Sequence, residues 1–400
     1  MASRRLPWSS PENRLAPLVR RKREARAALL DLTASNPTRV GLDYPREAIA
    51  AALADPGSAA YEPEARGLRL AREAVSASLD RDGHVAPPDR IVLTASTSEA
   101  YAHLFKTLAD PGERVLVPRP SYPLFDYLAA LESVRLGAYP LDLDARWGLD
   151  LDGVERALRD EGDPPRALVV VNPNNPTGSA LRRDERRRLE ALCAARGVPI
   201  IADEVFFDYL DEPAAGAADP IVSLLDHGPE NAARTLTFTL GGLSKSCGLP
   251  QMKLGWIVVD GPDDLAREAL ERLDLVADTF LSVGTPVQLA AARLLDLGRG
   301  IRESIRHRVR QNLGALLETA SGSPAVRVLP RDGGWYAVLQ VPAVRPEEEL
   351  VLALLEQDDV LVHPGYFFDF PREAFLILSL LPAPGEFSEA LRRILARASA

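Results

Sequence analysis

Apolar, β-rich runs alternate with helix-like stretches between residues 90 and 259. The runs are RIVLTAS (90–96), RVLVP (114–118), ALVVVNP (167–173), PIIADEV (199–205), TLTFTL (235–240) and GWIVV (255–259). Several are apolar at successive positions, as strands covered on both faces of a parallel sheet are. Helical patterns such as 98–110 and 182–197 lie between them. This alternation predicts an α/β fold with a mostly parallel sheet covered by helices.

The pattern changes after residue 285. A helical stretch from 285 to 322 is longer than most globular helices, and it predicts one long helix or two that are broken near Gly298–Gly300. Strand-like runs at 326–330, 335–341, 360–365 and 375–381 and a helix at 347–357 follow. We therefore expect a large domain at 45–285 and a smaller α+β domain built from 1–44 and 286–400.

Composition narrows the class of protein. The net charge of −10 argues against a nucleic-acid partner, because phosphate binding needs a basic surface. No run is long and apolar enough for a membrane span. The basic N-terminus predicts a surface helix rather than a transit peptide. Two cysteines, Cys193 and Cys247, give no disulfide framework. We expect a cytoplasmic protein with no metal site.

Four short motifs follow strands, where ligands gather in α/β sheets. TASTSEAY (94–101) places Ser96, Thr97 and Ser98 at a helix N-terminus, where they could hold a phosphate or only cap the helix. NPNNPTG (172–178) follows a buried strand, so its asparagines either form a turn or reach a ligand.

The other two motifs carry charges. Asp203 ends the strand in IIADEVFFDY, where a buried carboxylate needs a cation unless it caps a helix. Lys245 and Lys253 lie in GGLSKSCGLPQMKLGW, and these are two of only four lysines in a chain with 43 arginines. A lysine after a strand is commonly a solvated surface charge, but the rarity of lysine here favours a specific role.

Together and in this order, NNPTG, ADEV and SKxxGLPxxxLGW resemble the class I/II aminotransferases, which are fold-type I pyridoxal-phosphate (PLP) enzymes of the aspartate aminotransferase superfamily. The resemblance covers nearly the whole chain. It implies a seven-stranded, mostly parallel sheet, PLP as cofactor, and a homodimer with shared active sites.

The resemblance also implies residue roles. Lys245 would form a Schiff base with PLP and shuttle a proton, and Asp203 would pair with the pyridine nitrogen. The remaining cofactor contacts would be Asn175 to the 3′-oxygen, Tyr122 stacked on the ring, Ser96, Thr97 and Ser98 on the phosphate, and Tyr61 on the phosphate in the neighbouring subunit.

Four positions depart from the family pattern. Phe206 replaces a tyrosine that would donate to the 3′-oxygen, Gly242 replaces a serine, and Lys253 replaces a phosphate-binding arginine. Ser244, next to Lys245, remains as a possible phosphate partner, and Lys253 supplies charge without the planar fork of arginine.

The fourth departure concerns the substrate. The strand that usually carries a carboxylate-binding arginine reads FLILSLL (375–381), with Ile377 or its neighbour at that position. Arg39, in SNPTRVG with Asn36, is the candidate replacement, with Arg119 and Arg331 as weaker ones. VHPGYFFDFP (362–371) should line the pocket through His363 and Tyr366, although His363 can equally be structural.

The sequence thus predicts a PLP-dependent aminotransferase that moves an amino group from an amino acid to a 2-oxo acid. The missing arginine leaves a PLP-dependent β-lyase or decarboxylase as an alternative. A non-catalytic PLP-binding protein is a minor alternative, because Lys245, Asp203 and Asn175 are retained together. Regulators of that kind carry a DNA-binding domain, for which the first 40 or so residues leave no room.

Overall fold

The computed structural model describes residues 3–6, 12–212, 219–226 and 235–398. Its largest sheet has eight strands in the order β2-β9-β8-β7-β6-β3-β4-β5. Their bounds are β2 Ile91–Thr94, β9 Gly255–Asp260, β8 Thr237–Gly242, β7 Ile200–Asp203, β6 Pro165–Val171, β3 Arg114–Arg119, β4 Arg135–Asp142 and β5 Gly148–Leu149. Strands β8, β7, β6, β3 and β4 run parallel, whereas β9 is antiparallel to both neighbours.

The predicted α/β fold with a mostly parallel sheet is confirmed, and each of the six predicted runs contains a strand. The sheet has one strand more than the expected seven. The additional strand is β5, whose two residues pair antiparallel with the end of β4.

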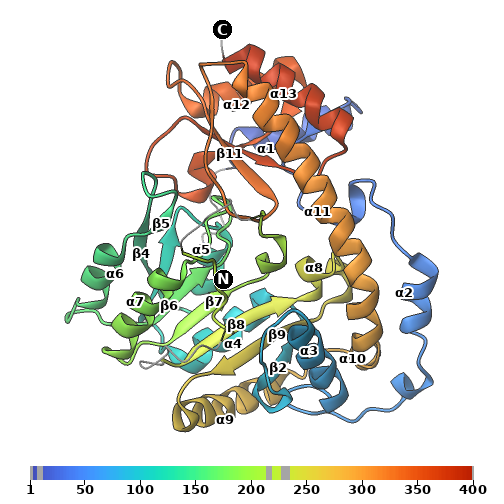
Figure 1. Cartoon of the computed structure of the whole chain (residues 1–400), viewed down its shortest axis with the longest axis vertical. Helices are drawn as coiled ribbons and strands as arrows, with labels where there is room; N and C mark the ends of the chain where they lie inside the picture. Colours follow the sequence, from blue (N-terminus) through green and yellow to red (C-terminus); the bar gives the residue numbers. More distant parts are fainter. Residues whose placement is uncertain (1–2, 7–11, 213–218, 227–234, 399–400) are drawn as a thin grey trace.

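Helices cover both faces of this sheet (Figure 1). In β6, Ala167, Val169 and Val171 pack on one face with α4 (Thr97–Leu108), α5 (Leu124–Leu131) and α9 (Asp263–Phe280). The alternate residues Leu168 and Val170 pack on the other face with α6 (Leu151–Leu158) and α7 (Arg183–Ala194). Burial on both faces explains why the run is apolar at every position.

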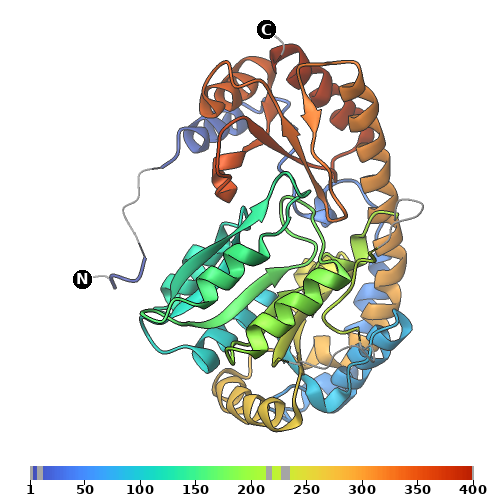
Figure 2. The same ribbon diagram turned by 60° about the vertical axis from the view of Figure 1, so that its left-hand side comes forward.

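A second sheet is antiparallel, with the order β10-β11-β14-β13. Its strands are β10 Arg327–Val328, β11 Tyr336–Gln340, β14 Phe375–Ser379 and β13 His363–Pro364, and the helices α12 (Glu347–Asp358) and α13 (Pro384–Ala398) lie beside it (Figure 2). The N-terminal residues join this part of the molecule. Strand β1 (Leu30–Asp31) pairs with β12 (Val360–Leu361), and Lys22 of α1 (Leu15–Glu24) donates to the carbonyl of Glu356 at 2.9 Å.

One long helix links the two sheets. After α10 (Thr285–Leu289), α11 runs without interruption from Ala291 to Ser321, along one side of the molecule (Figure 1). Of the two expected alternatives, the single long helix is confirmed and the break near Gly298–Gly300 is not found; a short helix precedes it, with the boundary at Ala290. Gly298 serves close packing instead, because a Cβ there would lie 2.3 Å from Sγ of Cys247, directly after α8 (Leu243–Ser246).

The remaining elements are short connections, with one longer helix. They are α2 Arg46–Ala52, α3 Arg69–Arg81, and the 3-10 turns η1 Pro37–Arg39, η2 Pro56–Ala59, η3 Pro88–Arg90, η4 Phe207–Tyr209, η5 Pro250–Met252 and η6 Gly365–Phe368. Within the described ranges, no helix has both the length and the apolarity to cross a membrane.

Candidate active site

The sequence motifs meet at the carboxyl edge of the large sheet. Strands β6, β7 and β8 are parallel and end there, and β2 ends there too, because two antiparallel steps through β9 restore its direction. A cavity of about 270 Å³ lies at this edge. It is lined by Thr33, Ser35, Thr97, Ser98, Tyr122, Pro123, Phe125, Val171, Asn175, Asp203, Val205, Phe206, Lys245, Tyr336, His363, Phe367 and Phe368.

Lys245 is held by its backbone and by aromatic rings. The Tyr209 hydroxyl donates to the Lys245 carbonyl at 2.6 Å. The Lys245 ammonium lies 4.7 Å from the ring centre of Trp335 and 5.4 Å from that of Phe206. Burial lowers the pKa of Lys245 to about 8, and the opposing effect of Asp203 is smaller. A larger share of neutral amine is therefore present near neutral pH than for an exposed lysine.

Asp203, the last residue of β7, is enclosed beneath the cavity. Its Oδ2 accepts a hydrogen bond from the Tyr101 hydroxyl at 3.1 Å, and its Oδ1 accepts from the Val205 amide at 3.3 Å. Burial raises the pKa of Asp203 to about 6, although these hydrogen bonds and Lys245 act to lower it. The carboxylate thus lacks a close cation of its own, and a cationic ligand group would supply one.

Asn175 has a free side-chain acceptor. Its Oδ1 is buried and has no hydrogen-bond partner among the described residues. The neighbouring Asn174 instead donates to the Pro120 carbonyl at 3.1 Å and to Thr177 at 2.9 Å. Buried polar atoms are normally paired, so the Asn175 side chain is available to a ligand in the cavity, as acceptor through Oδ1 or as donor through Nδ2.

The TASTSEAY motif divides between two roles. Thr97 and Ser98 line the cavity at the first turn of α4. Ser96 does not line it; its Oγ accepts from the Glu99 amide at 3.2 Å, while the Glu99 carboxylate accepts from the Ala95 amide at 2.6 Å. Ser96 therefore caps the helix and leaves Thr97 and Ser98 facing the cavity.

Two of the other predicted cofactor residues, Tyr122 and Phe206, line the cavity. Ser244 and Lys253 do not line it. Lys253 is exposed with φ 54°, and it precedes the segment that packs on the β2–α4 turn. At Gly242 a Cβ would lie 3.1 Å from the Gly255 Cα, so a serine there would require the backbone of β9 to shift slightly.

The predicted substrate residues are mostly outside the cavity. His363 lines it, but Arg39, Asn36 and Tyr366 do not, and Asn36 Oδ1 accepts from the Thr38 amide at 3.0 Å within its own turn. Tyr61 is 74% exposed on the surface of this subunit.

The two weaker arginine candidates have partners elsewhere. Arg119 lies 3.6 Å from Asp126, and it also pairs with Asp369. Arg331 is buried and pairs with Asp211 at 3.0 Å. Neither side chain lines the cavity.

Several lining or supporting residues were not predicted. Ser35 lies one position before the predicted Asn36, so the correct segment was identified but the wrong residue. Tyr101 is a buried residue of the predicted helix, and no sequence signal shows that its hydroxyl reaches Asp203. Thr33 and Tyr336 come from segments distant in sequence.

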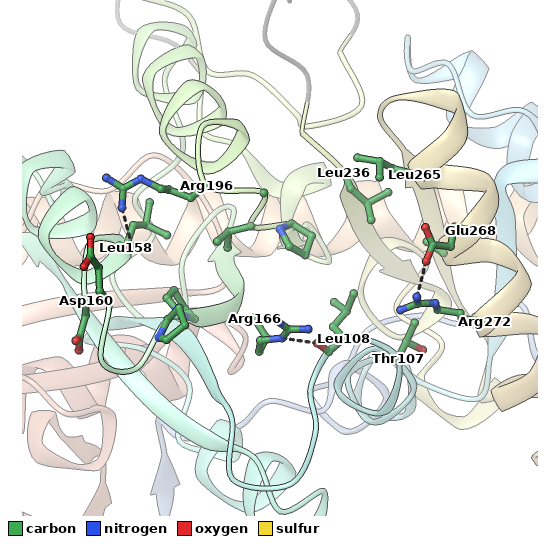
Figure 3. A pocket seen from close by; sticks show the side chains of 17 residues that line it. Thr107, Leu108, Leu158, Asp160, Arg166, Arg196, Leu236, Leu265, Glu268 and Arg272 are labelled. Atoms are coloured by element: carbon green, nitrogen blue, oxygen red, sulfur yellow. Dashed lines mark hydrogen bonds and ion pairs between the residues drawn. The ribbon is translucent and has the colours of Figure 1, made fainter.

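A larger cavity, of about 540 Å³, lies at the opposite, amino edge of β6, β7 and β8 (Figure 3). Its arginines are already engaged: Arg166 donates to the Leu108 carbonyl at 3.4 Å, Arg196 donates to the Leu158 carbonyl at 3.1 Å, and Arg272 pairs with Glu268. It contains no lysine, so the smaller cavity is the candidate active site.

Comparison with known proteins identifies the family of the chain. The family model for aminotransferase class I and II matches residues 28–394, and the chain belongs to this family. It is an aminotransferase, as the motifs predicted. The family and its fold imply PLP as the general cofactor.

Individual relatives cover different shares of the chain. It is 26% identical over 373 residues to the glutamate-pyruvate aminotransferase AlaA of Haemophilus influenzae, covering 92% of this chain and 89% of that protein. It is 31% identical over 239 residues to the S-alkyl-thiohydroximate lyase SUR1 of Arabidopsis thaliana, covering 59% and 49%. The alanine aminotransferase structure from Pyrococcus furiosus covers all of both chains with a TM-score of 0.84 at 24% identity, and it shows the same fold.

Proposed function

We propose that the cavity at the carboxyl edge of the large sheet binds PLP and that Lys245 is the amine to which the cofactor attaches. The observation that carries the proposal is that Lys245, Asp203 and Asn175 line one cavity, with a lysine whose pKa is lowered to about 8 and an asparagine oxygen without a partner. PLP, when bound, supplies an aldehyde carbon and an electron-withdrawing ring.

The protein groups then have distinct tasks. The neutral Nζ of Lys245 would attach to the cofactor and, when displaced by the substrate amino group, would accept and return a proton. The ionised Asp203 would keep the ring nitrogen protonated, and Tyr101 orients that carboxylate. Asn175 would donate to the ring oxygen through Nδ2, and Tyr122 and Phe206 would enclose the ring.

Thr97 and Ser98 would hold the phosphate at the N-terminus of α4, where free amides favour an anion. Ser244 and Lys253 would lie farther out on the same side. The uptake of the cofactor itself is testable by adding PLP to the cofactor-free protein and following the visible absorbance of the protein-bound cofactor.

The amino-transfer reaction is tested with the PLP-loaded enzyme and single amino acids in the absence of an acceptor. We expect the bound cofactor to change to its amine form, with one equivalent of 2-oxo acid released per subunit, and to revert when a 2-oxo acid is added. L-alanine and L-glutamate are the first donors to compare, because the H. influenzae relative is named for glutamate and pyruvate and the two differ by a second carboxylate. Failure of every standard amino acid to convert the cofactor would refute the proposal.

A β-lyase is the second candidate, supported by the relative named as a lyase and by the lack of arginine among the described lining residues. A lyase releases ammonia and a 2-oxo acid continuously without an acceptor. An aminotransferase stops after one equivalent, so ammonia measured under these conditions separates the two.

The assembly is a further part of the proposal. We infer a large domain at 45–285, a small domain from 1–44 and 286–400, and a cytoplasmic homodimer in which Tyr61 reaches the phosphate bound by the partner. The 74% exposure of Tyr61 in the single subunit supports such a role. Sedimentation of the PLP-loaded enzyme tests the dimer: a monomer that still transfers amino groups would refute it.

A further inference from the structure

The cavity contains one basic group without an assigned task. Among the described residues that line it, the side chains that can carry a full charge near neutral pH are Lys245, Asp203 and His363. The first two belong to the cofactor in the proposed function. No arginine lines the cavity, yet an amino acid or 2-oxo acid brings a carboxylate that needs a cation or strong donors when it leaves water.

His363 lies on the side of the cavity that the small sheet forms, across from the residues of the large sheet. It is the first residue of β13, opposite Ile377 of β14 in the antiparallel pair. Its ring lies 5.9 Å from that of Phe367 and 5.7 Å from that of Phe368, centre to centre. Neither ring nitrogen makes a hydrogen bond to another described residue, so both are available to a ligand. The small sheet thus carries the free base, while the large sheet carries Lys245 and Asp203.

The surroundings favour the neutral form of this imidazole before a substrate carboxylate enters. Burial lowers the pKa of His363, and Asp31 of β1 opposes this more weakly. Asp31 is itself engaged, since its Oδ1 accepts from the Thr33 amide at 2.9 Å and from the Thr33 hydroxyl at 2.6 Å.

The other elements packed on β13 add little charge. Glu347 of α12 accepts from the backbone amides of Tyr366 at 3.0 Å and Phe375 at 2.7 Å. Strand β14 contributes no ionisable side chain, and η6 contributes only the Tyr366 phenol. An entering carboxylate is therefore the strongest new influence on the charge of His363.

We propose that His363 binds the substrate carboxylate and takes up a proton from solvent as that carboxylate enters, and that the substrates are monocarboxylic amino and 2-oxo acids with uncharged side chains. Ser35 adds a neutral hydroxyl among the lining residues, whereas the Thr33 hydroxyl is already donated to Asp31. A second carboxylate would find only aromatic and hydroxyl groups such as Phe367, Phe368 and Tyr336. This inference rests on the proposed aminotransferase function for the existence of such substrates, but its test does not require turnover.

The test is calorimetric titration of the PLP-loaded enzyme with propionate, an unreactive monocarboxylate, in HEPES and in imidazole buffer at the same neutral pH. The difference between the two heats gives the number of protons taken up. We expect uptake approaching about one proton per site in the unaltered enzyme, and binding that weakens as the pH rises above neutral. In His363→Gln, we expect no uptake and affinity weaker by about tenfold or more, because a charge-assisted hydrogen bond is lost.

His307→Gln is the matched control, because His307 is exposed on α11 and lies outside the cavity. It should behave like the unaltered enzyme. Proton uptake that persists in His363→Gln would overturn the role of His363, as would pH-independent propionate binding in the unaltered enzyme, which needs no variant to fold. Tighter binding of succinate than of propionate would overturn the substrate class. Failure of all amino acids to convert the cofactor would instead refute the aminotransferase proposal and leave the calorimetric result standing.

Discussion

The Tyr101 hydroxyl donates to Oδ2 of Asp203 at 3.1 Å, joining a helix of one sheet face to the end of a central strand. Tyr101 is itself fixed edge-on against Phe125, with ring centres 5.2 Å apart. The bond stabilises the ionised form of a carboxylate whose burial otherwise favours protonation. The packing of α4 on the sheet therefore influences the charge available to the cofactor ring.

Replacing Tyr101 with phenylalanine should move the pH dependence of cofactor binding. With the donor lost, the pKa of Asp203, about 6 in the intact protein, should rise by about one unit, since a hydrogen bond to a charged group contributes roughly 1.5–3 kcal/mol. PLP affinity should then begin to fall at a correspondingly higher pH as the solution is acidified. Quenching of the tryptophan fluorescence of the protein at a series of pH values measures the affinity.

Tyr139→Phe is the control for that experiment. Tyr139 is also buried, and its hydroxyl donates to the Val169 carbonyl at 2.7 Å, away from Asp203. An unchanged midpoint in Tyr101→Phe, or an equal shift in both variants, would show that the bond to Asp203 does not set the charge.

Lys245 should destabilise the cofactor-free protein below pH 8. Its folded-state pKa of about 8 lies below the ordinary value of 10.5, because burial disfavours the charged form. Below pH 8 the lysine is charged in both the folded and the unfolded protein, so the full cost of burying the charge lowers the free energy of unfolding. This cost disappears as the pH rises from 8 towards 10.5. Lys245→Met should be more stable by roughly 3 kcal/mol at pH 7, a difference that shrinks above pH 8. Urea unfolding at several pH values measures it. A Lys245→Met protein that is less stable at neutral pH would contradict the burial argument.

With phenylalanine rather than tyrosine at position 206, the group whose titration changes the absorbance of the bound cofactor should have a higher pKa. Phe206 is buried beside Lys245 and supplies no hydroxyl to the ring oxygen. Phe206→Tyr should lower that pKa by about one unit, because the new donor stabilises the ionised oxygen. Phe207→Tyr is the matched control, since Phe207 does not line the cavity. No change in the Phe206→Tyr titration would rule out this explanation.

Lys253 should tune phosphate binding without being required for it. The side chain is exposed, and the following segment brings Gly255 against the β2–α4 turn that carries Thr97. Lys253→Arg should change the PLP dissociation constant by a few-fold, since guanidinium binds phosphate bidentately where an ammonium acts as a point charge. The dissociation constant from equilibrium dialysis gives the answer, and an unchanged value would remove Lys253 from the cofactor site.

The central strands could be predicted because burial on both faces leaves a continuous apolar run, as in β6. Strand β4 was missed because it is half exposed and contains Gly137 and Pro140, which resemble loop residues. The boundary at Ala290 was also missed. A glycine pair resembles a helix break until the contact of Gly298 with Cys247 is known.

The site was predictable where it follows from strand ends. Lys245, Asp203 and Asn175 each come shortly after a parallel strand, so the topology alone brings them to one edge. The other side of the cavity is formed by Tyr336 and His363 of the small sheet and by Thr33 and Ser35 near the N-terminus. These segments are distant in sequence, so their meeting depends on tertiary packing. For that reason Ser35 was missed beside Asn36, and Arg39 was expected in a cavity that it does not line.

The most direct test of the central claim is to identify the residue that carries the cofactor. PLP-loaded enzyme is reduced with borohydride, digested and examined by peptide mass spectrometry. The account predicts the reduced cofactor on Lys245 alone among the lysines of the chain. Labelling of Lys253, or a fully active enzyme with no label on Lys245, would contradict it.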